Sequence, residues 1–392
     1  MANTAVVYTD ESAEERVRPS ERVGRDATEH PQTQRAFRER IKVVGVGGGG
    51  NNALDHIIRT GASGVEFLAV NTDANCLDKC LSVEKLVIGE KLTKGHGAGA
   101  RPEVGEQAAL ESRDAIRECL KGCDMVYLAA GMGGGTGTGA LPVIAGIAKD
   151  MGMLTVSVVT RPFGFEGKRR AKYAEEGIEK VKQVVDALIV VPNDRLLSLS
   201  ERTTSLTDAF AMADNVLRQA VQGVTDLVTK PGFINVDFAD LRNIMKHAGG
   251  AVMGIGTGSG EHRTQDALKR AMESPLMETS IHGAKGVILN VTASPSVGII
   301  EVQDASAKLQ ELIDPDANFI WGLVYDENMG EEIQMVVIAT GFDFDEAGSE
   351  TFYTGAKKKP LETVATATGD APLFSMDSPI DTPSYLRRRA RH

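Results

Sequence analysis

The chain has 392 residues, of which 42% are hydrophobic and 25% charged, and its formal net charge is −11 at pH 7. This length allows two or three domains with cores of their own. Nucleic-acid-binding proteins are usually basic, so we expect no nucleic-acid partner for this acidic chain. The mean hydropathy is −0.14 and no run of about 18 apolar residues occurs, so we expect no membrane span.

Two further features concern compartment and composition. The segment Met1–Arg40 lacks the apolar stretch of a secretory signal. Four cysteines do not make a disulfide framework in a chain of this length, and they fit a reducing cytoplasm, where we expect the protein. The compositional anomaly is glycine, with 42 residues or about 11% of the chain against a usual ~7%.

The first half of the chain reads as a polar arm followed by an α/β domain. Residues 1–40 are charge-mixed and without periodicity, which predicts a disordered arm. Over residues 41–204, apolar runs alternate with amphipathic segments, which predicts a Rossmann-like parallel sheet with helices on both faces. The expected strands are Ile41–Gly45, Glu66–Asn71, Met125–Ala130, Leu154–Thr160 and Ala187–Pro192, and the expected helices are Asn52–Arg59, Glu103–Leu120, Ala140–Met151 and Arg170–Val185.

A long helix is expected next, over residues 205–230. Ser205 and Asp208 form a start that resembles a capping box, and apolar residues then recur every three or four positions. A Lys-Pro-Gly sequence at 230–232 ends the pattern. At about 23 residues, such a helix spans roughly 35 Å, enough to join two domains.

The remaining chain predicts a second domain and a tail. Residues 231–342 mix strands with short connections and helices, which indicates an α+β domain. Residues 343–378 read as a flexible linker and residues 379–392 as a short terminal peptide. The expected strands are Val252–Gly256, Gly286–Thr292, Gly298–Val302, Phe319–Tyr325 and Ile333–Thr340, and the expected helices are Arg263–Glu273 and Asp304–Ile313.

The excess glycine is clustered rather than dispersed. Gly45–Gly50 reads GVGGGG, Gly131–Gly139 reads GMGGGTGTG, and four more glycines lie in Gly89–Gly99. The first two clusters each follow an expected strand and precede an expected helix, where backbone N–H groups bind anions. Glycine permits close approach of a phosphate and positive φ, and Thr136 and Thr138 add hydroxyl groups. We therefore expect a polyphosphate cradle.

Four interpretations of these loops compete. Gly45, Gly47 and Gly50 match the dinucleotide fingerprint, but no acid is well placed about 20 residues further on. A P-loop requires a Gly-Lys-Ser/Thr sequence, and Gly167-Lys168 is followed by Arg. A nucleoside triphosphate held by two glycine loops accounts for both clusters. The remaining alternative is that the two glycine loops are tight turns that bind no ligand.

At this point a family resemblance is plain. Gly131–Gly139 is similar to the signature of the tubulin/FtsZ superfamily, and the order and spacing of further motifs from about Lys42 to Gly341 resemble the FtsZ family of bacterial cell-division GTPases. The motifs are Gly45–Asn52, Asn71–Asp73, Pro162–Arg170, Pro192–Asp194, Asn235–Arg242 and the terminal Asp381–Arg389. The resemblance implies GTP and GDP as ligands, with Mg²⁺ held mainly by the phosphates rather than by protein ligands.

The resemblance also implies a GTP-binding set. Aspartate accepting from the guanine N1 and N2 donors suits Asp214, and an aromatic face beside the base suits Phe210; a plain core role for Phe210 and a solvated basic run for Arg170 are the alternatives. The set is Gly47, Gly48, Gly49, Asn51, Asn52, Asn71, Thr72, Asp73, Gly97, Ala98, Gly131, Gly133, Gly134, Gly135, Thr136, Gly137, Thr160, Pro162, Glu166, Arg170, Asn193, Phe210 and Asp214.

An acidic loop follows the long helix. By spacing alone, Asn235, Asp237 and Asp240 read as the capped start of a helix. The resemblance implies instead that this loop enters the nucleotide site of the next subunit, where the two aspartates position or polarise the attacking water and Asn235 assists. Neither site is then complete in one chain, and activity rises with assembly.

The cysteines and the tail complete the set of candidates. Cys76/Cys80 and Cys119/Cys123 make two C-x₃-C pairs, for which small buried residues are a better interpretation than a zinc site. The resemblance implies that the terminal peptide, with Asp381, Pro383, Tyr385, Leu386 and Arg387, docks membrane-tethering and regulatory division proteins.

The resulting expectation is a GTPase that assembles head to tail at the mid-cell division ring. A nicotinamide-dependent oxidoreductase and a non-hydrolysing structural member of the superfamily are the alternatives. The first has no use for the acidic loop, and the second lacks the acid pair.

Overall fold

The computed structural model describes Val7–Tyr8 and residues 39–342, apart from residues 63, 200–202, 231–233, 235 and 278. The chain divides into two compact units, Met1–Asp343 and Phe344–His392, and every described residue belongs to the first. The predicted linker and terminal peptide therefore lie outside the described residues. No described helix is long and apolar enough to cross a membrane.

The first part of the unit alternates strands and helices as predicted, and the five expected strands are confirmed to within one residue. The strands are β2 (Ile41–Val46), β3 (Glu66–Asn71), β4 (Glu84–Val87), β5 (Met125–Gly131), β6 (Leu154–Arg161) and β7 (Ala187–Pro192). The helices are α1 (Gly47–Arg59), α2 (Ala74–Asp78), α3 (Glu90–Thr93), α4 (Pro102–Glu111), α5 (Arg113–Leu120), α6 (Thr136–Asp150), α7 (Lys168–Lys182) and α8 (Asn193–Leu196), with 3-10 turns at Gly164–Glu166 and Leu197–Leu199.

The predicted long helix is α9 (Leu206–Thr229), and its start is confirmed, because the Ser205 hydroxyl accepts a hydrogen bond from the Asp208 backbone N–H at 3.1 Å. The elements that follow are α10 (Phe238–Met245), β8 (Gly249–Ser259), α11 (Arg263–Met272), β9 (Gly286–Ala293), α12 (Ile299–Gln310), β10 (Asn318–Tyr325), a 3-10 turn (Glu327–Met329) and β11 (Glu332–Thr340).

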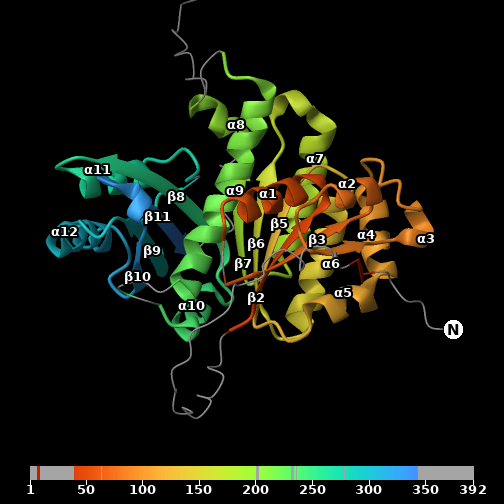
Figure 1. Ribbon diagram of the computed structural model, residues 1–392, viewed down its shortest axis with the longest axis horizontal. Coiled ribbons are helices and arrows are strands. Elements are labelled where there is room, and N and C mark those ends of the chain that lie inside the picture. Colours follow the sequence, from red (N-terminus) through yellow and green to blue (C-terminus); the bar gives the residue numbers. More distant parts are fainter. Residues whose placement is uncertain are drawn as a thin grey trace, which may run out of the picture. The chain divides into compact units, whose positions relative to one another are not determined.

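The described strands form one sheet in the order β1-β4-β3-β2-β5-β6-β7-β8-β11-β9-β10 (Figure 1). Neighbours from β4 to β8 pair in parallel, whereas β11 pairs antiparallel with both β8 and β9. The first part is thus a parallel α/β sheet and the second a mixed α+β sheet, as the composition of the elements predicted.

Three apolar cores hold these layers together. The first joins α1 and α9 to the sheet and includes Leu217 and Val224 of α9 with Ile288 and Val336 of the second part. The second lies against α4 to α7, and the third packs α11 and α12 against β9 and β11. Because α9 contributes to a core shared by both parts, it fixes the start of the chain's second part relative to the first (Figure 1).

One predicted strand is wrong. Gly298–Val302 was expected to be extended, but Ile299 begins helix α12. Val302, Ala305 and Leu309 are buried at a spacing of three and four residues, while Ile299 and Ile300 are 58% and 69% exposed. A short apolar run does not distinguish a strand from a helix start, so the pattern misled the prediction.

Other boundaries also differ from the prediction. The helix expected over Glu103–Leu120 is two helices that meet at Ser112, whose hydroxyl accepts from the Gly89 N–H at 3.0 Å. Helix α1 begins at Gly47, within the first glycine cluster, rather than at Asn52. The arm expected to be disordered contains the two-residue strand β1 (Val7–Tyr8).

Candidate functional site

The predicted binding residues converge on one edge of the parallel sheet. β2 and β5 are neighbours, and Val46 lies opposite Ala130 at their carboxyl ends. The chain leaves β2 towards β3 on one side and continues from β5 towards β6 on the other. The two glycine loops therefore meet at the switch point of the strand order, where open α/β sheets bind ligands. The segments that follow β3, β6 and β7 contribute Asn71–Asp73, Thr160–Pro162 and Asn193 at the same edge.

Several glycines of the two loops are required by close backbone packing, between the loops, within one loop or against a strand. A Cβ on Gly47 would lie 2.8 Å from the Gly137 backbone nitrogen, and Gly47 itself has a φ of +71°. A Cβ on Gly137 would lie 2.7 Å from the Gly131 carbonyl oxygen, and one on Gly50 would overlap the Ala129 carbonyl oxygen. Gly47 thus lets the two loops approach backbone to backbone, Gly137 lets the second loop fold on itself, and Gly50 lets the first loop approach β5. The sequence analysis had explained the glycine clusters by phosphate contact instead.

Gly48 and Gly134 are different. A Cβ on either residue would meet no described atom within 4 Å. Gly48 lies in the first turn of α1 and Gly134 just before α6, so both border the N-terminus of a helix that follows a parallel strand. Free space beside backbone N–H groups at two helix N-termini is what a polyphosphate requires.

The two classes of glycine predict separable effects. Gly48→Ala is expected to leave the unfolding free energy unchanged and to weaken GTP binding by about tenfold or more, or roughly 1.4 kcal/mol, since the methyl group enters the open space. Gly50→Ala is expected to cost about 2 kcal/mol of stability because it overpacks the loop contact. Denaturant unfolding and nucleotide titration of both variants check this, and equal loss of stability in the two variants would contradict it.

Asn51 and Asn71 lie behind the loops and hold them. The Asn51 side chain donates to the Gly45 carbonyl at 2.9 Å and accepts from the Asn71 side chain at 2.8 Å. The Asn71 oxygen accepts from the Thr72 backbone N–H at 2.9 Å. Both asparagines are at most 3% exposed. The structure therefore places them as positioning residues, whereas the exposed Asn52 faces outward at the start of α1.

The third glycine cluster, Gly89–Gly99, lies against the Asn71–Asp73 segment and the second glycine loop. The Gly97 N–H donates to the Thr72 carbonyl at 3.1 Å, and Asp73 forms an isolated bridge with His96. A Cβ on Gly135 would lie 2.8 Å from the Ala98 Cβ, and Thr72 and Thr136 share a hydroxyl hydrogen bond of 2.7 Å. The structure thus brings the segment of Gly97 and Ala98 next to the second loop.

Thr138 is one residue that the sequence placed incorrectly. Its hydroxyl accepts from the Gly133 backbone N–H at 2.8 Å, and its side chain is 2% exposed. The hydroxyl therefore closes the second loop internally instead of facing a ligand. Of the two threonine hydroxyls in the second loop, that of Thr136 stays near the junction of the loops, beside the Thr72 hydroxyl.

An aromatic cluster lies beside the N-terminal part of α9. The Phe210 ring makes edge contacts with Phe163 at 5.3 Å and with Phe165 at 6.4 Å between ring centres. Phe210 is 40% and Phe165 58% exposed, so neither is a core residue. Exposed aromatic rings at this edge fit a flat base. The sequence contained the signal for the two additional rings in its Pro-Phe-Gly-Phe segment, but it did not assign them a role.

Two polar side chains next to this cluster can form hydrogen bonds that no described residue supplies. The Asn193 side chain is 4% exposed, and its buried Oδ1 atom has no hydrogen-bond partner among the described residues. Burial raises the pKa of Asp214 to about 7. Buried polar atoms are normally paired, so an orphaned acceptor points to a ligand that supplies donors. Guanine offers its N1–H and its N2 amino group.

Glu166 and Arg170 close the site on the side of β6. One Glu166 oxygen accepts from the Phe163 backbone N–H at 2.9 Å, and the other pairs with the Arg170 guanidinium. A Cβ on Gly133 would lie 2.8 Å from the Arg170 carbonyl. These contacts place the Arg170 backbone beside the second glycine loop and pair its side chain with Glu166, while that side chain stays 49% exposed, so the solvated basic run remains an alternative.

The cysteines are free thiols. Cys76 is exposed, and Cys119 and Cys123 are buried. Burial raises the pKa of the Cys80 and Cys119 thiols to about 11. Among the described residues no cluster of three or more histidine, cysteine, aspartate or glutamate side chains is arranged to hold a metal ion.

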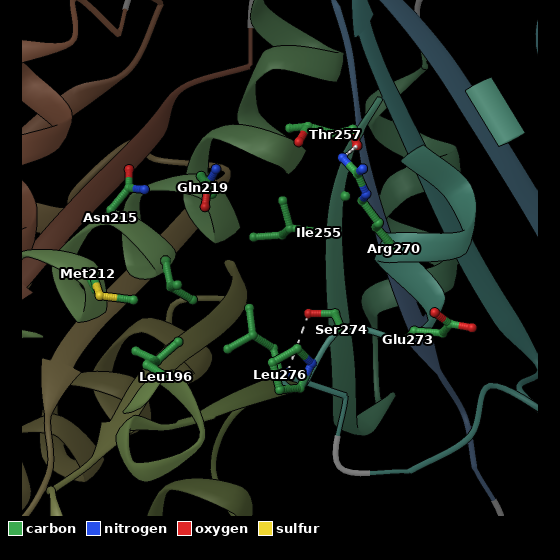
Figure 2. Close-up of a pocket in the computed structure, with 13 residues that line it drawn as sticks. Leu196, Met212, Asn215, Gln219, Ile255, Thr257, Arg270, Glu273, Ser274 and Leu276 are labelled. Atoms are coloured by element: carbon green, nitrogen blue, oxygen red, sulfur yellow. Dashed lines mark hydrogen bonds between the residues drawn. The ribbon is translucent and has the colours of Figure 1, made fainter. Parts of the chain in front are cut away.

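A separate cavity of about 480 Å³ lies away from the glycine loops (Figure 2). Met212 and Gln219 of α9 face Ile255 and Thr257 of β8 across it, and Arg270 donates to the Thr257 carbonyl at 2.7 Å. None of the predicted GTP-binding residues lines this cavity.

The acidic loop lies at the opposite end of the sheet. Asp237 occupies the N-cap position of α10, but its side chain accepts no capping hydrogen bond. Asp237 and Asp240 are both exposed, and neither carboxylate has a partner among the described residues. Asn235 is outside the described residues. The capping interpretation therefore leaves both carboxylates unused.

The lengths of β6 and α9 give the separation between the acidic loop and the glycine loops. Arg242 of α10 donates to the Gly152 carbonyl at 3.1 Å, just before the amino end of β6, whereas the loops follow the carboxyl ends of the strands. The eight residues of β6 span about 25 Å. Along α9, the 15 steps from Asp214 to Thr229 span about 22 Å. Figure 1 shows α10 at the opposite end of the sheet from α7 and α8. One chain cannot bring the acids to its own phosphate loops.

Comparison with known proteins agrees with this architecture. Residues 40–201 match the GTPase domain of the Tubulin/FtsZ family, and residues 249–343 match the FtsZ family C-terminal domain. An empty FtsZ dimer from M. jannaschii is 40% identical with a TM-score of 0.77, over 85% of this chain and 96% of that chain. A mutant FtsZ from the same organism is 42% identical with a TM-score of 0.76, over 78% and 92% of the two chains.

A more distant structure shares the fold. The CetZ2 protofilament from Haloferax volcanii, bound to GTPγS, is 20% identical with a TM-score of 0.64, over 80% of this chain and 96% of that chain. The domain matches, the two glycine loops at the switch point and the 40% identity to a solved FtsZ agree. The chain belongs to the FtsZ family and is a GTPase of the tubulin/FtsZ fold.

Proposed function

We propose that the protein assembles head to tail into filaments and hydrolyses GTP at sites shared between neighbouring molecules, as part of a cytokinetic ring at mid-cell. The separation of the acidic loop from the glycine loops carries this proposal. An exposed acid pair at one end of the molecule and a nucleotide cradle at the other complete each other only between two copies. Such a head-to-tail contact repeats without closing and makes filaments.

The residues of this chain divide the work in that arrangement. The glycine loops and Thr136 bind the phosphates, while Asn193, Phe210 and Asp214 hold the guanine. Asp237 and Asp240 of the next molecule accept hydrogen bonds from the attacking water, which positions and polarises it. Mg²⁺ bound to the phosphates supplies charge neutralisation. Removal of Mg²⁺ with a chelator is expected to abolish turnover.

Steady-state GTP turnover across protein concentration tests the proposal. Specific activity is expected to be near zero at low concentration and to rise cooperatively above a threshold, since a monomer lacks a complete site. Specific activity that does not change with concentration contradicts a shared site.

The place of this activity in the cell is a separate part of the proposal. The named relatives come from M. jannaschii and Haloferax volcanii, and their names do not place this chain in a cell. A fluorescent fusion in the source cell tests the proposed ring and its cytoplasmic, mid-cell position. Co-sedimentation of filaments with candidate tethering proteins, with and without residues 381–392, tests the proposed docking of partners by the terminal peptide.

A further inference from the structure

Helix α8 carries Asn193, a residue proposed to contact the base, but it is too short to hold its own orientation. It has four residues, and helices of so few residues depend on contacts with the rest of the protein. We propose that Arg195 is a positioning residue that fixes α8 so that the side-chain oxygen of Asn193 faces the guanine base. The inference rests on the proposed role of Asn193 at the base.

Asp194 ties one side of α8 to the aromatic cluster. Its carboxylate accepts from the Gly164 backbone N–H at 2.8 Å. Gly164 lies between Phe163 and Phe165, whose rings contact the Phe210 ring. This hydrogen bond sets the distance of α8 from the rings, but a single hydrogen bond leaves the helix able to pivot about it.

Arg195 ties the other side of α8 to the second part of the chain. Its Nη1 atom donates to the Pro275 carbonyl at 3.2 Å and to the Met277 carbonyl at 3.1 Å. Both hydrogens of this nitrogen are therefore used, and two acceptors fix the plane of the rigid guanidinium as well as its position. With Asp194 and Arg195 both engaged, α8 is held from two sides.

The segment that receives Arg195 is itself firmly held. It follows α11, and the Met277 N–H donates to the Ser274 carbonyl at 2.9 Å, while the Leu276 N–H donates to the Ser274 hydroxyl at 3.4 Å. Leu276 and Met277 are 7% and 9% exposed. The carbonyls of Pro275 and Met277 therefore form a fixed pair of acceptors for the guanidinium.

Apolar packing joins α8 to this segment only loosely. Leu196 of α8 and Leu276 both line the cavity of about 480 Å³ (Figure 2), and the walls of a cavity do not interdigitate as a close-packed core does. The hydrogen bonds of Arg195 therefore carry more of the connection. Asn193 needs that connection, because its Oδ1 atom is buried without a partner among the described residues, and a hydrogen bond weakens steeply when its angle changes.

Inosine triphosphate (ITP) reports on this contact, because it lacks the 2-amino group of guanine. That amino group has two hydrogens, so it can donate to Asp214 and to Asn193 at once. Arg195→Met keeps an unbranched apolar stem and removes the donors. We expect it to lower the preference for GTP over ITP about fivefold, as weakening one hydrogen bond does. Competition binding to the nucleotide-free chain, below the assembly threshold, measures the preference.

Three further variants separate positioning from general support of the fold. Arg195→Lys should restore most of the preference, because an ammonium group can also donate to both carbonyls. Arg270→Met is the matched control, since Arg270 is likewise an exposed helical arginine that donates to a carbonyl beside the cavity, and it should keep the wild-type preference. Asn193→Ala should lower the preference about tenfold, and adding Arg195→Met to it should lower the preference no further, because Arg195 acts through Asn193.

Several results would overturn the inference. Equal losses of GTP and ITP affinity in Arg195→Met, or losses that add in the double variant, would show that Arg195 does not act through Asn193. If Asn193→Ala keeps the preference, or the wild type has none, the contact of Asn193 with the base fails as well. Because the preference is a ratio, a smaller folded fraction leaves it unchanged. Binding below the assembly threshold requires neither filaments nor hydrolysis, so none of these results bears on the shared site.

Discussion

Replacing Asp240 by alanine is expected to lower GTP turnover by about a hundredfold or more while GTP affinity stays unchanged, a loss typical of removing a group that acts on the proton of the attacking water. Asp240 is exposed and lies far from the glycine loops of its own chain. Its loss therefore cannot disturb nucleotide binding in the same molecule. Nucleotide titration together with turnover above the assembly threshold measures both quantities.

A matched control separates catalysis from helix stability. Asp266 is an exposed acid in the first turn of α11, as Asp240 is in α10. Each variant loses a similar favourable interaction with its helix dipole, about 0.3–1 kcal/mol. Only Asp240→Ala should lose turnover. Normal turnover in Asp240→Ala, or an equal loss in Asp266→Ala, would remove the acid pair from the mechanism.

Asp214→Asn is expected to weaken GTP binding by about a hundredfold, because the ionised carboxylate accepts from two guanine donors and charged hydrogen bonds contribute most. An asparagine presents an amide N–H donor in place of one of the two carboxylate acceptors, so it opposes one guanine donor with another donor. The variant should therefore prefer xanthosine triphosphate, whose C2 oxygen replaces the guanine amino group. Competition between the two nucleotides measures the change. Asp208→Asn, which neutralises an exposed charge on the same helix, should keep the preference for GTP.

The same carboxylate predicts a pH dependence of binding. Burial raises the pKa of Asp214 to about 7 in the unliganded chain. Below that pH the group is protonated and must lose its proton to accept from guanine, so GTP affinity should fall about tenfold for each pH unit below 7 and level off above it. Asp214→Asn should show a flat profile over this range. A wild-type affinity that is constant from pH 5.5 to 8 would contradict the assignment of Asp214 as the guanine acceptor.

Short apolar runs between amphipathic segments were sufficient to predict the parallel sheet, whose central strands β2, β5 and β6 are buried along almost their whole length. A spacing of three or four residues was sufficient to predict α9, which buries one face. The sequence pattern failed at Ile299, where two exposed isoleucines begin a helix. It also failed at Val7–Tyr8, where four apolar residues in a polar arm were too few to register as an element. Both errors involve short apolar runs, whose conformation is decided by tertiary neighbours.

The structure brings the predicted glycine loops together at one edge of the sheet, and it shows local contacts for several of their residues that the sequence did not predict. Spacing placed the glycine loops at strand ends, and the parallel topology brought them together. Sequence alone could not show that Gly47, Gly50 and Gly137 serve loop packing or that Asn51 and Asn71 are buried behind the loops. These roles depend on which backbone atoms meet, which only the folded structure reveals.

The shared site is tested most directly by mixing two inactive variants. Asp240→Ala keeps an intact nucleotide site, and Gly48→Ala at a GTP concentration too low to fill its site keeps an intact acidic loop. Where the acidic loop of a Gly48→Ala molecule meets the nucleotide site of an Asp240→Ala molecule, the site is complete. The account predicts that turnover returns on mixing, at about a quarter of the wild-type contacts. A mixture as inactive as its separate components would contradict a site built from two molecules.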